Sequence, residues 1–392
     1  MNKQGLMKPL NRREVLRTLA AMGGLAALSS LLEACTKAGL LAPTDAPTQL
    51  TFPPVSQTLK SELSPAATPS TFKTPEETGT LSAPALPTAE AGISQVAFVK
   101  TRDRSEGVRQ AIDLLGANVV VGKSVFLKPN FNSSDPTPGS THPDVLSALV
   151  LKLKEMGAEA ITVGDRSGMG DTRRVMSDLG VFDLGEKLEF KIMIFDTLSK
   201  EDWVMIQPTG SHWKNGFAIA RPCLEADTLV QTCCLKTHQY GGHFTLSLKN
   251  SVGMVAKRIP DDDHDYMDEL HFSRDQRRMI AEINSAYTPG LIVVDGVEAF
   301  ISGGPDDGER VDSQVILAGT DRIAIDAAGV ALLRYHGCKT SVAKGRIFEQ
   351  EQIARAVELG LGADTPNKIE FLTPDGDSAA YAGEIKTVLS YG

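Results

Sequence analysis

From Ile93 to the end of this 392-residue chain, short apolar runs alternate with amphipathic segments. This alternation is typical of a mainly parallel β-sheet covered by helices. The sequence therefore predicts an α/β domain over residues 93–392, with helices on both faces of the sheet. We expect strands at 95–100, 124–128, 160–164, 191–195, 228–234, 291–295 and 313–318, and helices at 105–115, 143–156, 171–179, 275–287 and 321–335.

The N-terminus has the pattern of an export signal. Arg12 and Arg13 form a twin-arginine pair, and an uncharged run rich in Leu and Ala follows at residues 19–32. A spanning helix needs about twenty apolar residues, so this run is too short to cross a bilayer. We expect recognition by the twin-arginine export machinery, which places the mature protein at the outer face of the cytoplasmic membrane or in the cell envelope.

The signal, residues 1–35, ends in Leu-Glu-Ala-Cys, which resembles the cleavage box of a lipoprotein. In that reading Cys35 is lipidated and anchors the protein to the membrane. The alternative is simple cleavage near Ala34, with Cys35 incidental. The protein is exported under either interpretation.

Residues 36–92 are rich in Pro, Thr, Ser and Ala and contain few large apolar side chains. Such a segment cannot bury enough surface to offset its conformational entropy. We expect a disordered linker that holds the folded domain away from the membrane.

Charge and cysteine content exclude some classes of protein. The net charge is −9 and no basic patch with interleaved aromatic residues is present, which argues against nucleic-acid binding. Beyond Cys35 the cysteines are Cys223, Cys233, Cys234 and Cys338. We expect them to pack in the core; a disulfide from Cys223 to Cys233 or Cys234 stays open.

Polar residues follow four of the expected strands. In open α/β sheets, ligands bind beyond the carboxyl ends of the strands, so these residues are candidates for one shared site. The four strand ends are Lys128-Pro129-Asn130, Gly164-Asp165, Lys236-Thr237-His238 and Asp295-Gly296.

Lysine and asparagine residues at these ends, together with Lys249 and Asn250 farther along the chain, predict binding of a small anionic molecule. Lys128, Lys236 and Lys249 can form a cationic cradle, and Asn130 and Asn250 can orient the ligand through their amides. For each lysine alone, a solvated strand or helix end is the competing interpretation. We expect Asp165, Asp295 and Lys236 to be the catalytic residues, the two carboxylates acting as general base or metal ligand.

Four of the seven histidines fall between residues 233 and 272. Imidazole is the commonest metal ligand, so we expect His238, His243 and His271 to bind a divalent metal. The spacing matches no established metal motif, and His271 packed in the core beside Phe272 is the competing interpretation.

Two hypotheses follow. In the first, the protein is an exported, metal-dependent enzyme acting on a small anionic substrate. In the second, it is a lipid-anchored protein that binds an anionic ligand without chemistry. Nucleophile-elbow, phosphate-loop and dinucleotide-binding motifs are all missing from the sequence, which excludes the most readily recognised enzyme classes.

Several motifs together resemble the family called domain of unknown function 362, over roughly residues 96–335. The resemblance implies an α/β fold and brings no established reaction. Many relatives carry a ferredoxin-like iron-sulfur module, but this chain lacks a Cys-x-x-Cys-x-x-Cys run, so we expect no iron-sulfur cluster. The motifs are Lys128-Pro129-Asn130, Thr141-His142-Pro143, Gly164-Asp165, Leu235-Lys236-Thr237-His238, Leu248-Lys249-Asn250-Ser251-Val252-Gly253, Leu270-His271, Val294-Asp295-Gly296, Gly303-Gly304-Pro305 and Ala318-Gly319-Thr320-Asp321 with Asp326-Ala327.

Overall fold

The computed structural model describes residues 92–116 and 119–392. The predicted signal, Cys35 and the predicted linker up to residue 91 lie outside these residues. Within them, no helix has both the length and the apolar character needed to cross a membrane.

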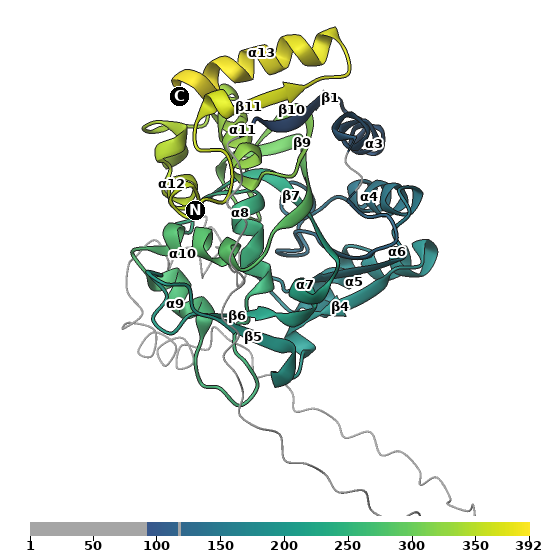
Figure 1. The fold of residues 1–392 in the computed structure, drawn as a ribbon, viewed down its shortest axis with the longest axis vertical. Coiled ribbons are helices and arrows are strands. Elements are labelled where there is room, and N and C mark those ends of the chain that lie inside the picture. Colours follow the sequence, from purple (N-terminus) through teal and green to yellow (C-terminus); the bar gives the residue numbers. More distant parts are fainter. Residues whose placement is uncertain (1–91, 117–118) are drawn as a thin grey trace, which may run out of the picture. The chain divides into compact units, whose positions relative to one another are not determined.

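A nine-stranded sheet forms the centre of the domain (Figure 1). Its strand order is β11-β1-β10-β9-β7-β2-β3-β4, and β8 pairs with β7 beside this path. A separate two-stranded sheet consists of β5 and β6. The strands are β1 (Ser94–Lys100), β2 (Ser124–Lys128), β3 (Ala160–Asp165), β4 (Lys191–Ile194), β5 (Trp203–Ile206), β6 (Phe217–Ala220), β7 (Thr228–His238), β8 (His243–Thr245), β9 (Pro289–Gly303), β10 (Gly308–Gly319) and β11 (Ile369–Leu372).

The sheet is mixed but mainly parallel, as predicted. β4, β3, β2, β7 and β9 are parallel neighbours, and β1 pairs in parallel with β11. β10 runs antiparallel between β1 and β9, and β8 returns antiparallel along β7. The carboxyl ends of β2, β3 and β7 therefore meet at one edge, where the site is expected.

Helices cover both faces of the sheet, which confirms the α/β prediction. Figure 1 shows α3 and α4 on one side and α10, α11 and α12 on the other. The helices are α3 (Arg104–Leu115), α4 (Pro143–Glu155), α5 (Thr172–Asp178), α6 (Val181–Leu188), α7 (Arg221–Glu225), α8 (Ser247–Asn250), α9 (Tyr266–Phe272), α10 (Gln276–Ile283), α11 (Arg322–Tyr335), α12 (Glu351–Glu358) and α13 (Gly376–Tyr391).

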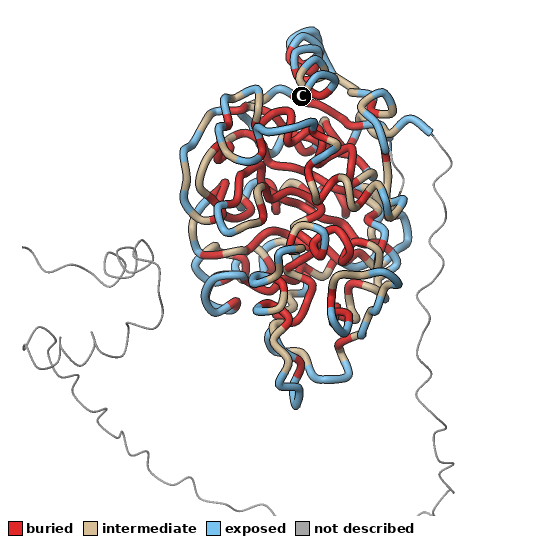
Figure 2. Tube along the Cα trace, turned by 90° about the vertical axis from the view of Figure 1, so that its left-hand side faces the viewer, coloured by how far each residue is buried: buried red, intermediate tan, exposed pale blue. Residues whose placement is uncertain are grey.

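Alternating side chains of the central strands fill two different cores. In β1, Val96 and Phe98 join the core beneath α11 and α13, whereas Ala97 and Val99 join the core beneath α3 and α4. Period-two alternation with both faces covered explains why these strands are continuous apolar runs. Figure 2 shows the buried residues concentrated in the interior and the exposed ones in the outer turns.

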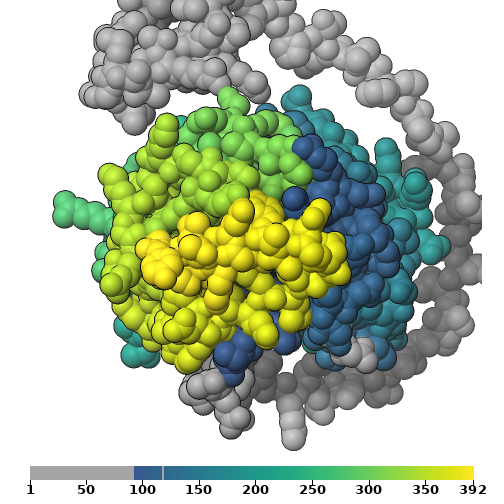
Figure 3. Space-filling model, turned by 90° about the horizontal axis from the view of Figure 1, so that it is seen from above, coloured from purple at the N-terminus to yellow at the C-terminus, as the bar shows by residue number. Residues whose placement is uncertain are grey.

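The C-terminal segment completes one edge of the domain. β11 pairs in parallel with β1, so the end of the chain lies beside the start of the described domain. Figure 3 shows this C-terminal part in yellow beside the blue N-terminal part. The sequence did not predict β11 or α13; β5, β6, β8, α6–α9 and α12 were also not predicted.

Two predicted strands continue beyond their expected ends. β7 extends to His238 and β9 extends to Gly303. Lys236 and His238 are therefore strand residues, and Asp295 lies inside β9 rather than after it. The extension of β7 pairs with β8, and the extension of β9 pairs with β10. A local apolar pattern does not show such pairings between strands.

Candidate functional site

A cavity of about 540 Å³ lies at the carboxyl edge of β2, β3 and β7. α8 and the segment after it close another side of this cavity, which we call the cationic pocket. The structure brings together most of the predicted site residues here. Those that line the pocket are Lys128, Asn130, Asp165, Lys236, His238, Lys249, Asn250 and His271.

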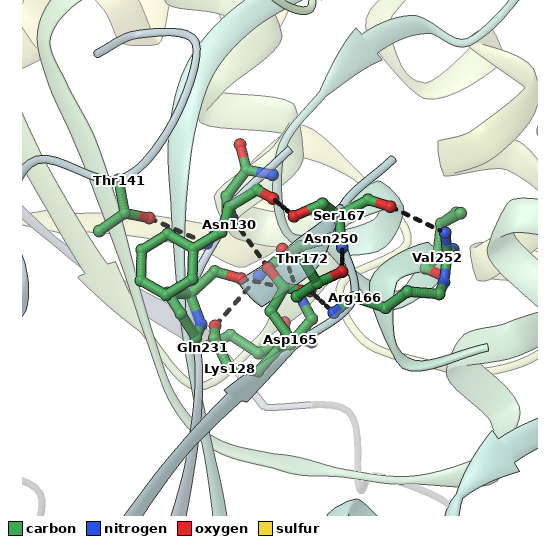
Figure 4. A network of polar contacts seen from close by, with 12 residues as sticks. Lys128, Asn130, Thr141, Asp165, Arg166, Ser167, Thr172, Gln231, Asn250 and Val252 are labelled. Atoms are coloured by element: carbon green, nitrogen blue, oxygen red, sulfur yellow. Dashed lines mark hydrogen bonds and ion pairs between the residues drawn. The ribbon is translucent and has the colours of Figure 1, made fainter. Parts of the chain in front are cut away.

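Lys128 and Asp165 form a buried ion pair at the base of the pocket (Figure 4). Lys128 Nζ lies 2.8 Å from Asp165 Oδ1 and also donates to Asn250 Oδ1 at 3.0 Å. Asp165 accepts the backbone N–H groups of Phe131 at 2.8 Å and Arg166 at 2.7 Å. Burial raises the pKa of the Asp165 carboxyl, while the ion pair and the two backbone donors oppose that shift. Both partners are therefore held in place by the fold.

Gly253 lets the segment after α8 approach this ion pair. A Cβ atom at Gly253 would lie 2.5 Å from Asp165 Oδ1 and 2.8 Å from Lys128 Nζ. Arg166 holds the same segment, because Nη2 donates to Val252 O at 2.7 Å and Nε donates to Val255 O at 2.8 Å. The guanidinium thus connects the end of β3 to the wall of the pocket.

Lys236 is fully buried on β7 and has no carboxylate partner among the described residues. Its ammonium donates to the backbone carbonyls of Gly139 at 2.5 Å and Pro305 at 3.0 Å. Burial lowers the pKa of Lys236. An ammonium has three protons, so two carbonyl acceptors leave one proton available to a ligand.

Lys249 differs from Lys128 and Lys236. Its side chain is partly exposed, and within the described residues its ammonium makes no hydrogen bond or ion pair. Burial, together with the nearby cations Lys236, Arg166 and Lys128, lowers the pKa of Lys249 to about 7. Lys249 is therefore free to interact with a ligand.

His238 lies next to Lys249. A Cβ atom added to Gly242 would lie 2.7 Å from Lys249 Cε and 3.1 Å from His238 Nδ1, so both side chains pack against this glycine. His238 is buried, and burial followed by the charges of Lys249 and Lys236 holds its pKa well below the usual value. The imidazole is consequently neutral at physiological pH.

A buried polar network fixes α8, which carries Lys249 and Asn250. Asp326 of α11 accepts the backbone N–H groups of Ser247 at 2.8 Å and Leu248 at 3.1 Å. Burial raises the pKa of Asp326 to about 8. On the other side, Asn284 Nδ2 donates to Leu248 O at 2.9 Å. Asp326 is therefore a positioning residue for α8.

Four residues of the pocket have buried polar atoms without a hydrogen-bond partner among the described residues. Buried polar atoms in proteins nearly always have a partner, so unpaired atoms that converge on a cavity indicate the position of a ligand. These atoms are Asn130 Oδ1, Asn132 Nδ2, His238 Nδ1 and Thr245 Oγ1.

Asp295 does not belong to the pocket, so its assignment to the same site needs correction. Its carboxylate binds Arg104 Nε at 2.9 Å and accepts Thr137 Oγ1 at 3.3 Å and Val297 N at 3.1 Å. Position 295 faces the core beneath α3 and α4 because it shares the strand parity of Leu291, Val293 and Val297. Asp295 therefore forms an internal ion pair with Arg104 of α3.

The structure does not assemble the predicted set of three histidine ligands. Among the residues it describes, no group of three or more His, Cys, Asp or Glu side chains is arranged to hold a metal ion. His238 and His243 are opposite each other in the β7–β8 hairpin, but His243 does not line the pocket. His271 does line it, with its ring Nδ1 2.7 Å from Met267 O. Phe272 beside it is 84% exposed, so the alternative of a core position for this pair is wrong.

Arg166, Asn132 and Thr245 line the pocket but were not assigned to the site from the sequence. Arg166 follows Asp165 directly, and Asn132 lies in the loop that begins with Asn130. Their positions next to predicted site residues could therefore have indicated both. Thr245 pairs with Lys236 across the unpredicted β7–β8 hairpin. That hairpin contains Tyr-Gly-Gly, a turn sequence that could have revealed it.

The four described cysteines are buried and unpaired, which agrees with a packing role. Cys233 belongs to the core beneath α11, and burial raises its pKa well above the usual value. No disulfide joins Cys223 to Cys233 or Cys234 in this structure.

Comparison with known proteins places the chain in a family. The thylakoid-associated protein sll1697 of Synechocystis sp. is 26% identical over 218 residues, which are 54% of this chain and 63% of that protein. This chain thus matches less than two thirds of the relative's length.

The lactate racemase apoprotein from Thermoanaerobacterium thermosaccharolyticum is 16% identical, with a TM-score of 0.35 over 62% of this chain and 56% of that chain. Similarity at that level assigns neither fold nor function. The sequence profile of the family named Domain of unknown function (DUF362) matches residues 125–331, which are more than half of the chain and include every residue that lines the cationic pocket. The protein belongs to the DUF362 family.

Proposed function

We propose that the cationic pocket binds a small anionic substrate and that the domain is an enzyme acting on it. The observation that carries the proposal is the convergence of unpaired buried polar atoms with cations on one cavity. A ligand with negatively charged oxygens would satisfy the free protons of Lys249 and Lys236 and the amide of Asn132.

The charge balance of the pocket favours an anion. The cations in its wall are Lys128, Lys236, Lys249, Lys257 and Arg166, and Asp165 is the buried carboxylate that opposes them. Two further carboxylates, Asp265 and Asp268, also line the cavity. Asp268 is exposed, and Asp265 is occupied by Arg258 and by the N-terminus of α9. An incoming anion would compensate the remaining positive charge.

His238 supports an enzyme over a simple binding protein. A neutral imidazole with an unpaired Nδ1 atom in the pocket can accept a proton from a bound substrate. Asp165 is committed to Lys128 and two backbone donors, so we assign it to positioning rather than proton transfer. The proposed proton transfer uses the Nδ1 atom of His238.

We also propose export through the twin-arginine route, with a lipid anchor at Cys35. Support comes from the Arg12-Arg13 pair, the short apolar run and the Leu-Glu-Ala-Cys box. An enzyme attached in this way would act on small anions outside the cytoplasmic membrane.

Isothermal titration calorimetry with oxalate and its neutral isostere oxamide tests the binding claim. We expect oxalate to bind and oxamide not to bind. Lys249→Met should weaken oxalate binding roughly 10- to 100-fold, because a hydrogen bond to a charged group is worth about 1.5–3 kcal/mol. The matched control is Lys187→Met, which removes an exposed lysine of α6. Equal oxalate affinity in both variants would contradict the proposal. Bound oxalate without turnover of any related anion would favour the alternative, a non-catalytic binding lipoprotein.

A further inference from the structure

Three of the lysines that line the cationic pocket, Lys128, Lys236 and Lys249, differ in the number of hydrogen-bond acceptors around their ammonium groups. Lys128 Nζ has three acceptors: Asp165 Oδ1, Asn250 Oδ1 and Pro129 O at 2.6 Å. Lys236 Nζ has two carbonyl acceptors. Lys249 Nζ has none among the described residues. Acceptors stabilise an ammonium, so the fold supports the charge on the first two lysines and not on the third.

The surroundings of Lys249 also disfavour its charge. Its near charged neighbours are Lys236, Arg166 and Lys128, and no carboxylate pairs with it. A desolvated amine beside other cations loses its proton readily and becomes a nucleophile. The amine is also reachable, because Lys249 lines the cavity and is partly exposed.

A proton carrier lies beside this amine. His238 packs against the same glycine as Lys249, and its Nδ1 atom is buried and unpaired. A reaction that needs only a general base would require the His238 imidazole and no second uncharged nitrogen. An uncharged Lys249 amine beside a neutral imidazole suits a reaction in which the amine attacks and the imidazole moves protons.

We infer that Lys249 is a catalytic nucleophile that forms an imine with an aldehyde or ketone group of the anionic substrate. The inference rests on the proposed function, because the other cations of the pocket must hold the anionic group while the carbonyl carbon faces Lys249. The substrate class is therefore a small carboxylate or phosphate that also carries a carbonyl group.

The atoms of this step balance without a further reactant. The Lys249 lone pair forms the C–N bond while the carbonyl π electrons move to oxygen. A proton passes from nitrogen to that oxygen through His238 and gives the carbinolamine. A second proton transfer by the same route releases the oxygen as water and leaves the C=N bond. One amine and one carbonyl give one imine and one water.

Reductive trapping tests this inference on the intact folded protein. Glyoxylate, the smallest aldehyde carboxylate, is added with sodium cyanoborohydride at pH 7, and peptide mass spectrometry measures the adduct at each lysine. We expect Lys249 to be labelled at least about tenfold faster than exposed Lys187, because an ordinary lysine with a pKa near 10.4 is almost fully protonated at that pH. Oxalate should suppress labelling of Lys249 and leave that of Lys187 unchanged.

Lys249→Arg keeps a positive charge at position 249 and removes the nucleophilic amine. This variant should lose the adduct at position 249, while Lys187 is labelled at the wild-type rate. If oxalate binds the wild type but Lys249 is labelled no faster than Lys187, the imine inference is wrong and the proposed function stands. If oxalate does not bind the wild type at all, the proposed function is wrong and this inference fails with it.

Discussion

Lys128 Nζ lies 2.8 Å from Asp165 Oδ1, and both side chains are almost fully inaccessible to solvent. The pair joins the carboxyl ends of β2 and β3, two strands that are adjacent in the sheet. Asn250 of α8 binds the same ammonium, so the pair also fixes the helix that carries Lys249. A single buried contact thus connects three elements around the pocket.

Removing one partner of this ion pair should destabilise the fold more than removing both. Lys128→Met leaves the Asp165 carboxylate buried without its cation, and we expect a loss of about 3–5 kcal/mol in the free energy of unfolding. Lys128→Met combined with Asp165→Asn should recover part of that loss. Urea denaturation measures both variants. Additive losses in the double variant would show that the two residues do not depend on each other.

Anion affinity should fall as the pH rises through about 7. The pKa of Lys249 is lowered to about 7, so its charge is present below that pH and lost above it. A bound anion favours the charged form, and binding near pH 7 should therefore take up protons. Calorimetry with oxalate in two buffers of different ionisation enthalpy measures this uptake. Lys249→Arg should bind without proton uptake; unchanged uptake in that variant would assign the effect to another group.

Asp326→Ala should destabilise the protein and also weaken anion binding. The substitution leaves the backbone N–H groups of Ser247 and Leu248 buried and unpaired, at about 1–3 kcal/mol for each group. Asp103→Ala is the matched control, because Asp103 caps α3 at an exposed position. We expect a loss of about 1 kcal/mol there and unchanged oxalate affinity. Equal effects of the two substitutions on binding would contradict the positioning role of Asp326.

Export is testable on the intact precursor. Changing Arg12 and Arg13 to lysine should leave the precursor in the cytoplasm, because the twin-arginine route reads that pair. Cell fractionation measures the distribution. Mass spectrometry of the mature protein should show a lipid on Cys35, and an unmodified Cys35 would leave simple cleavage as the correct reading.

Sequence patterns located much of the fold because its central strands are short, buried and apolar. β2 has the predicted bounds, and Lys128, Asp165 and Lys236 do meet at one edge of the sheet. Parallel strands bring their carboxyl ends together, so residues at those ends can be grouped without knowing the strand order.

Other features depend on pairings between distant segments. The face that Asp295 occupies follows from the length and parity of β9, and both are set by its partner β10. The separation of His243 from the pocket depends on the tight β7–β8 hairpin, in which His243 adopts a φ of 65°. The role of Asp326 depends on a contact between α11 and α8, which lie far apart in the chain. Apart from the Tyr-Gly-Gly turn of the β7–β8 hairpin, local patterns do not specify these pairings.

The most direct test of the anionic-substrate claim is a crystal structure of the protein with oxalate at saturating concentration. We predict oxalate in the cationic pocket, with its oxygens within hydrogen-bond distance of Lys249 Nζ, Lys236 Nζ and Asn132 Nδ2. An empty pocket under those conditions, or oxalate ordered only elsewhere on the domain, would contradict the claim.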